Sequence, residues 1–240
     1  MLFRSATANA KKNLANAREL FESYLQSVFT NKDEGWMDKR IGSICDLLNG
    51  FAFKSDDAVS ASNVQLVRMG NLYGDRLNLE RKPVFYPDKF AIDYKRYVLV
   101  KGDLIISLTG TTGKEDYGYT VRVPECDNAL LMNQRIAKFD LINEEFVNKA
   151  FLLHFLRSRV FLDVLYSTAN GTRQANLSSV TIKNLLIPLC SIKEQTKIAS
   201  SLDLMKEDIQ RLETIYQQKL TVLEELKKSI LNQAFSGQLN

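Results

Sequence analysis

Histidine is the residue type that most often moves protons in enzymes, and this chain of 240 residues contains one, His154. It stands in the apolar run of residues 151–156 (FLLHFL), where we expect a core imidazole with satisfied hydrogen bonds rather than a catalyst. A single histidine excludes metal sites built from several histidines and argues against a Ser-His-Asp triad. The three cysteines, Cys45, Cys126 and Cys190, are too far apart for a metal knuckle, and their odd number does not give an even disulfide framework.

Residues 110–114 (GTTGK) contain part of a nucleotide-binding loop, but the rest of that motif is missing. A phosphate-cradling loop needs glycine five positions before its second glycine and Ser or Thr after its lysine. Leu108 and Glu115 occupy these positions. The chain also lacks a Gly-x-Gly-x-x-Gly motif and the Asp/Asn-Pro-Pro-aromatic motif of amino methyltransferases. We therefore expect a protein without catalytic activity, bound cofactor or metal.

Two polar loops carry the residue types that read DNA, residues 109–119 (TGTTGKEDYGY) and 170–176 (NGTRQAN). Arg, Lys, Asn and Gln recognise base edges, while hydroxyls and backbone N–H groups bind phosphate. From composition alone, each loop could also be an ordinary solvated turn. The residues expected to contact DNA are Lys54, Ser55, Arg68, Asn71, Tyr73, Thr109, Thr111, Thr112, Lys114, Tyr117, Tyr119, Arg173, Gln174 and Asn176.

The middle of the chain predicts the α+β domain that would carry these loops. Nine of the eleven glycines lie between residues 35 and 118, among short β-rich segments at 64–68, 97–100, 103–108 and 119–123. Residues 143–168 have helical spacing of apolar side chains. We place this domain at residues 32–190.

The C-terminal segment, residues 191–240, predicts a long coiled-coil helix. It has neither Gly nor Pro between 191 and 236, and apolar residues recur at heptad spacing with one interruption, at Lys219. Such a seam needs a partner helix, and we expect a second copy of the chain to supply it. The alternative is a helix that lies across its own domain. The expected dimer contacts are Ile198, Leu202, Met205, Ile209, Leu212, Tyr216, Leu223, Leu226 and Ile230.

Residues 1–31 predict a shorter helix that repeats the end of the long one. Apolar and small residues step by three and four from Phe3 to Val28. Shifted by 206 residues, the N-terminal segment aligns with the C-terminal one, for example Leu14 with Leu220 and Phe29 with Phe235. This is the pattern of a piece cut from an array in which helix and domain alternate.

Composition and charge set the broad class. The chain is 45% apolar and 25% charged, and no run of eighteen apolar residues predicts a membrane span. The first residues lack the apolar core of an export signal, so we expect a cytoplasmic protein. A net charge of +4 is compatible with nucleic acid but does not demand it.

Six motifs, taken in order, resemble the specificity subunits of type I restriction–modification systems. They are residues 50–55 (GFAFKS), 109–114 (TGTTGK), 131–137 (LMNQRIA), 176–178 with 187–189, 194–198 (EQTKI) and 226–237 (LKKSILNQAFSG). Each motif is weak alone, but their order is specific. Cys190 departs from the family, which often has a second proline there.

The resemblance implies a fold, partners and a role. Full subunits of this family have two target recognition domains joined by two long antiparallel helices, and this chain resembles one half. It would read one half of a split target in double-stranded DNA, with the helices as a spacer. Its partners would be methyltransferase subunits, which use S-adenosylmethionine, and the restriction subunit, which uses ATP and magnesium. The alternative class is a coiled-coil scaffold whose α+β domain binds protein rather than DNA.

Overall fold

The computed structural model describes residues 2–32, 34–74, 76–142, 145–168 and 174–236. The chain forms two compact units, Met1–Val28 with Ser200–Asn240, and Phe29–Ala199. The predicted domain of residues 32–190 lies inside the second unit, which also includes the end of the first helix and the start of the last one. The mixed α+β class, with a long C-terminal and a shorter N-terminal helix, is confirmed.

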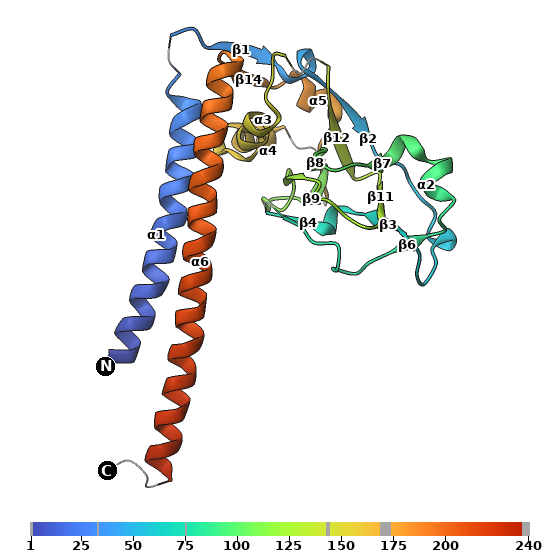
Figure 1. The fold of residues 1–240 in the computed structure, drawn as a ribbon. Helices are drawn as coiled ribbons and strands as arrows, with labels where there is room; N and C mark the ends of the chain where they lie inside the picture. Colours follow the sequence, from blue (N-terminus) through green and yellow to red (C-terminus); the bar gives the residue numbers. More distant parts are fainter. Residues whose placement is uncertain (1, 33, 75, 143–144, 169–173, 237–240) are drawn as a thin grey trace. The chain divides into compact units, whose positions relative to one another are not determined.

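The first unit is an antiparallel pair of helices, α1 (Leu2–Thr30) and α6 (Ile192–Phe235) (Figure 1). Both helices are free of glycine and proline, so nothing interrupts the backbone ladder. The Asn13 side-chain amide donates to the Tyr216 hydroxyl at 3.1 Å, and Arg18 pairs with Glu213 at 2.6 Å. Because a later residue of α1 meets an earlier residue of α6, the helices run in opposite directions.

The predicted α6 seam has a partner within the chain, which the sequence-based expectation of a second copy did not include. Tyr216 of this seam bonds to α1, and Leu202 is fully buried. Leu212 and Leu226 remain 38% and 46% exposed. The other seam residues are partly buried: Ile198, Met205, Ile209, Tyr216, Leu223 and Ile230. The homodimer itself stays a prediction.

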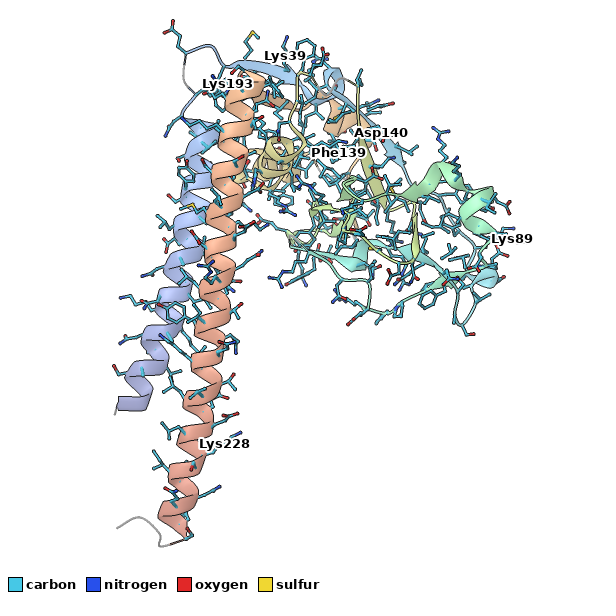
Figure 2. All side chains as sticks on the ribbon, in the orientation of Figure 1. Lys39, Lys89, Phe139, Asp140, Lys193 and Lys228 are labelled. Carbon is cyan, nitrogen blue, oxygen red and sulfur yellow. The ribbon has the colours of Figure 1, made fainter. Side chains whose placement is uncertain are left out.

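Two four-stranded sheets form the centre of the second unit (Figure 1). The first sheet is antiparallel in the order β10-β8-β12-β2. Along β12, Phe139 is 4% exposed whereas the neighbouring Asp140 side chain is 50% exposed, as the two faces of a strand require (Figure 2). The strands of this sheet are β10 (Thr120–Arg122), β8 (Leu104–Ser107), β12 (Ile136–Leu141) and β2 (Cys45–Asn49).

The second sheet has the order β6-β3-β11-β7, with β3 and β11 parallel. Buried apolar side chains from both sheets, among them Ile105, Val121 and Met132, share one core cluster. The strands of this sheet are β6 (Phe85–Tyr86), β3 (Val64–Val67), β11 (Ala129–Met132) and β7 (Val98–Leu99). Three two-stranded pairs complete the unit: β1 (Met37–Arg40) with β14 (Leu186–Leu189), β4 (Leu72–Tyr73) with β5 (Arg76–Leu77), and β9 (Thr109–Thr111) with β13 (Gln174–Asn176).

The helical segment expected at 143–168 contains two helices, α3 (Lys149–Arg157) and α4 (Arg159–Ser167). Ser158 separates them because it adopts extended backbone angles and accepts a hydrogen bond from the Phe161 N–H as the cap of α4. Asn148 caps α3 in the same way. Two short helices, α2 (Phe90–Asp93) and α5 (Ser179–Asn184), lie elsewhere in the domain.

The start of α6 belongs to the second unit. Gln195 is fully buried, and its side-chain amide donates to the carbonyls of Phe146 and Cys190, each at 2.9 Å. Its side-chain oxygen accepts from the Asn148 N–H at 3.0 Å. Three hydrogen bonds to backbone groups satisfy this buried amide and fix the first turn of α6 on the domain.

Candidate DNA interface

The pairing of β9 with β13 brings the two predicted loops together. The strands are antiparallel, with Thr111 opposite Gln174 and Thr109 opposite Asn176. The chain leaves β9 after Thr111 and enters β13 at Gln174, so the loop that follows β9 starts where β13 begins. Sequence spacing could not show this, since more than sixty residues separate the two strands.

Asp116 folds the loop back onto β9. Its carboxylate accepts hydrogen bonds from the Thr111 N–H at 2.6 Å and the Thr111 hydroxyl at 2.7 Å. The backbone N–H of Thr111 is the main reason why the pKa of Asp116 lies below its ordinary value of 3.8. A Cβ at Gly110 would collide with the Asp116 carboxylate and the Tyr117 ring, so this close approach requires glycine.

The tip of this loop is exposed and polar. Thr111, Thr112 and Lys114 are exposed, and the Lys114 N–H closes a turn by donating to the Thr111 carbonyl at 3.0 Å. A lysine held by its backbone while its side chain reaches solvent is suited to a phosphate contact.

Two aromatic residues lie beside the loop. The rings of Tyr73 and Tyr119 are 5.6 Å apart, and the Tyr119 hydroxyl donates to the Glu115 carbonyl at 3.3 Å. Tyr73 stands on the β4–β5 hairpin and is 68% exposed. The contact between the rings therefore places the hairpin next to residues 115–119.

Arg135 joins the same surface and was not among the predicted contacts. It follows β11 in the short connection to β12, and its side chain is exposed. Its guanidinium lies 3.8 Å from the Met69 sulfur, which also accepts from the Thr109 hydroxyl at 2.8 Å. The Arg135 carbonyl accepts from the Leu108 N–H, next to β9. The motif at residues 133–135 (NQR) was visible in the sequence, but its place beside β9 was not.

Three predicted contacts are buried and are corrected here to structural roles. Asn71 is 2% exposed, and its side chain bonds to the N–H of Arg68 and to the carbonyls of Asn78 and Arg81. Tyr117 is 4% exposed, its ring packs edge-on against Tyr166 at 5.0 Å, and burial raises its pKa. Thr109 is 9% exposed and bonds to Met69. The low exposure and the internal partners of these three side chains indicate that they support the loops.

The remaining predicted residues are divided between two regions. Lys54 and Ser55 are exposed near β6, because the Tyr86 hydroxyl donates to the Lys54 carbonyl at 3.0 Å. Figure 1 shows β6 well apart from β9. Arg68 donates to the Lys82 carbonyl at 2.5 Å. Asn176 is exposed on β13.

The structure does not test the second predicted loop directly. Arg173, and with it Asn170, Gly171 and Thr172, lies outside the described residues. For Gln174, only the backbone position on β13 is described.

Among the described residues, nothing gathers the side chains of a metal site. No group of three or more His, Cys, Asp or Glu side chains is placed to hold an ion there. His154 is 2% exposed and has an interaction partner, as expected of a core imidazole. Over the same residues, no helix is long and apolar enough to cross a membrane.

Comparison with known proteins identifies the family. Residues 33–225 match the type I restriction modification DNA specificity domain. The EcoBI specificity subunit of Escherichia coli is 25% identical over 226 residues, covering 94% of this chain and 44% of the relative. The EcoAI specificity subunit, also from Escherichia coli, is 30% identical over 183 residues, 76% of this chain and 30% of the relative.

Solved structures share the fold. The HsdS subunit from Thermoanaerobacter tengcongensis has a TM-score of 0.63 at 20% identity, over 98% of this chain and 55% of that one. A structure from a study of assembly and conformational transition of the type I R-M system has a TM-score of 0.73 at 20% identity, over 99% of this chain and 56% of that one.

The chain spans less than half the length of the curated relatives that it matches. These relatives are named specificity subunits, which agrees with the prediction of a non-catalytic chain and does not favour the scaffold alternative. With four-fifths of its length matched, the chain belongs to the family of type I restriction modification DNA specificity domains.

Proposed function

We propose that this chain reads one half of a bipartite target in double-stranded DNA through the surface around the β9–β13 pair. The observation that carries the proposal is the register of that pair, in which Thr111 lies opposite Gln174. It supports one continuous reading surface from two polar loops that are distant in the sequence. Exposed Thr111, Thr112, Lys114, Arg135 and Asn176 supply the side chains.

The side chains on this surface divide by chemistry. Lys114 and the threonine hydroxyls are suited to phosphate, while Arg135 and Asn176 can make bidentate contacts to guanine and adenine. The exposed Tyr73 ring, backed by Tyr119, offers a flat apolar face beside them. We retain Lys54, Ser55 and Arg68 as a second, separate group of candidate contacts, and Arg173 and Gln174 as candidates by sequence.

The partners follow from membership of the family. The chain would place methyltransferase subunits, and with them the restriction subunit, on DNA in the cytoplasm. S-adenosylmethionine would be bound by the methyltransferase, and ATP and magnesium by the restriction subunit. The reaction on the target adenine would then belong entirely to the partners.

The long helix would act as a spacer between two reading domains. At 1.5 Å per residue the 44 residues of α6 extend about 66 Å, which is roughly two turns of B-DNA. Because the chain has one recognition domain, the second half-site needs a second domain, either from another copy or from a different half. Two weak half-site contacts joined by a stiff helix pair gain affinity through effective concentration.

Mapping of adenine methylation by long-read sequencing tests this proposal. The chain is expressed with a methyltransferase subunit from a type I system of the same host, beside a strain that expresses the methyltransferase alone. A new split motif that depends on the chain is expected. A palindromic motif indicates two identical copies, and an asymmetric motif indicates pairing with a different half. If both proteins are produced and no new motif appears, the proposal is rejected.

A further inference from the structure

Arg159, the first residue of α4, holds the loop that carries Lys114. Its guanidinium binds both carboxylate oxygens of Glu115, at 2.7 and 3.1 Å. It also pairs with Asp163, one turn later in the same helix, at 2.5 Å. It lies 5.8 Å from the centre of the Tyr166 ring. A planar guanidinium that grips a carboxylate through two parallel bonds fixes its orientation as well as its distance.

Other contacts dock the same loop on α4. The Tyr166 hydroxyl donates to the Tyr117 carbonyl at 3.3 Å, and their rings meet edge-on. Gly118 has a φ of +74°, and a Cβ there would lie 2.8 Å from a Leu165 methyl group. The loop therefore rests on α4 at two points, in its middle through Glu115 and at its end through Gly118.

The contacts of the loop also determine which charges it presents to DNA. Glu115 and Asp116 directly follow Lys114, and carboxylates so close to a DNA phosphate would repel it. Asp116 is turned onto Thr111, and Glu115 is turned onto Arg159. Hydrogen bonding by the Arg159 side chain lowers the pKa of Glu115, so this carboxylate stays ionised and paired.

We propose that Arg159 is a positioning residue for sequence recognition: it holds the loop of residues 112–118 in its reading conformation without contacting DNA itself. This inference rests on the function proposed above. Without Arg159 the stretch around Glu115 would lose its anchor on α4 and would have to be ordered when DNA binds, while Asp116 and Tyr117 keep their own contacts. Ordering one or two residues of backbone at that moment weakens binding by roughly tenfold or more.

The experiment compares Arg159→Ala and Arg159→Lys with the unaltered chain, each in complex with the methyltransferase. Binding is measured by fluorescence anisotropy on the duplex found by methylation mapping and on a scrambled duplex, between 50 and about 200 mM salt. We expect Arg159→Ala to lose roughly tenfold in affinity for the target and little for the scrambled duplex. The slope of the logarithm of the binding constant against the logarithm of the salt concentration (the salt slope) should stay unchanged, because no phosphate contact is lost. Arg159→Lys should recover part of the affinity, since it can still reach Glu115.

Arg96→Ala is the matched control. Arg96 is an exposed arginine in the short 3-10 helix Lys95–Tyr97, outside the loop of residues 112–118, and its removal changes the net charge by the same amount. It should alter binding to the target by no more than about twofold. If Arg159→Ala lowers the affinity for both duplexes equally and reduces the salt slope by about one unit, Arg159 contacts phosphate directly and the proposal is overturned.

Hydrogen exchange of the free chain separates this inference from the proposed function. Amides of residues 111–118 should exchange faster in Arg159→Ala, while β8 and β12 keep their protection. If the unaltered complex does not discriminate its target, the DNA-reading function fails, yet the exchange result still reports whether Arg159 orders the loop. Unchanged exchange in the loop would disprove the positioning role whatever the DNA result.

Discussion

Lys114 shows how a single side chain on this surface can be tested for the kind of contact it makes. Its backbone is held by the Thr111 carbonyl, and its side chain is exposed. If it contacts phosphate, Lys114→Ala should lower affinity for all duplexes alike and reduce the salt slope by about one unit. Titrations of the methyltransferase complex at several salt concentrations measure this, with the exposed Lys95→Ala as the control. An unchanged slope with lost sequence preference would assign Lys114 to a base instead.

The three thiols should differ sharply in reactivity. Burial raises the pKa of Cys45 to about 12, and burial together with Glu194 raises that of Cys190 to about 12. Cys126 is partly exposed, so at pH 8 a maleimide should label it first and leave the other two protected until the chain unfolds. Mass spectrometry of timed samples measures the order, and rapid labelling of Cys45 in the folded chain would contradict it.

The buried thiol of Cys45 should also make the free energy of unfolding depend on pH in the alkaline range. Above its ordinary pKa of 9.0, Cys45 ionises in the unfolded chain but not in the folded one. Its contribution to stability is therefore complete below pH 9 and is lost as the pH rises from 9 towards 12.

For single residues, the sequence predicted which residue types the DNA-binding loops contain better than it predicted which of their side chains are exposed. Thr111, Lys114 and Asn176 are exposed as a DNA contact requires, whereas Asn71 and Tyr117 are buried. Asparagine and tyrosine can read a base or support a loop, and only the partners that they meet decide between these roles. Arg135 and Arg159 act across contacts between distant segments, so the local sequence around each could not show which residues it contacts.

At the scale of elements, the periodic segments were the most predictable. The long helix expected in residues 191–240 is α6 (Ile192–Phe235), and the strands expected at 64–68 and 103–108 are β3 and β8. The partner of the α6 seam was not predictable from its own heptads, because these specify a helix face and not which helix meets it. The break between α3 and α4 depends on one cap, Ser158, which stands between Arg157 and Arg159.

The helix pair makes a direct prediction about stability. Leu202 is fully buried while Leu204, two residues later on the same helix, is 63% exposed. Leu202→Ala should lower the free energy of unfolding by about 2–5 kcal/mol through lost burial and a cavity. Leu204→Ala is the control, because it changes helix propensity by the same amount but removes an exposed side chain. It should change the free energy of unfolding by no more than about 0.5 kcal/mol. Urea unfolding followed by circular dichroism compares them, and equal effects would contradict the observed burial.

At the scale of the whole molecule, the chain has one domain of the specificity family and spans less than half the length of its relatives. The α1–α6 pair covers part of the seam and leaves other large apolar side chains in solvent, with Leu20 at 62% and Val222 at 59% exposed. A helix pair with such residues can bury them against an identical pair, which makes the contact isologous. Among the predicted dimer contacts, Leu212 and Leu226 are the most exposed and would join such a contact.

This proposal predicts a mass about twice the 27.3 kDa of one chain, by light scattering at micromolar concentration. Replacing Leu212 and Leu226 by Glu should return the mass to that of one chain while the helix content remains, because charges at the contact cannot be desolvated cheaply. Glutamates at Gln218 and Ser229, which are exposed polar positions of the same helix, are the control and should leave the dimer intact. A dimer that survives the leucine replacements must be held by another surface. An unaltered chain that stays single would need a different half subunit, and its methylation motif should then be asymmetric.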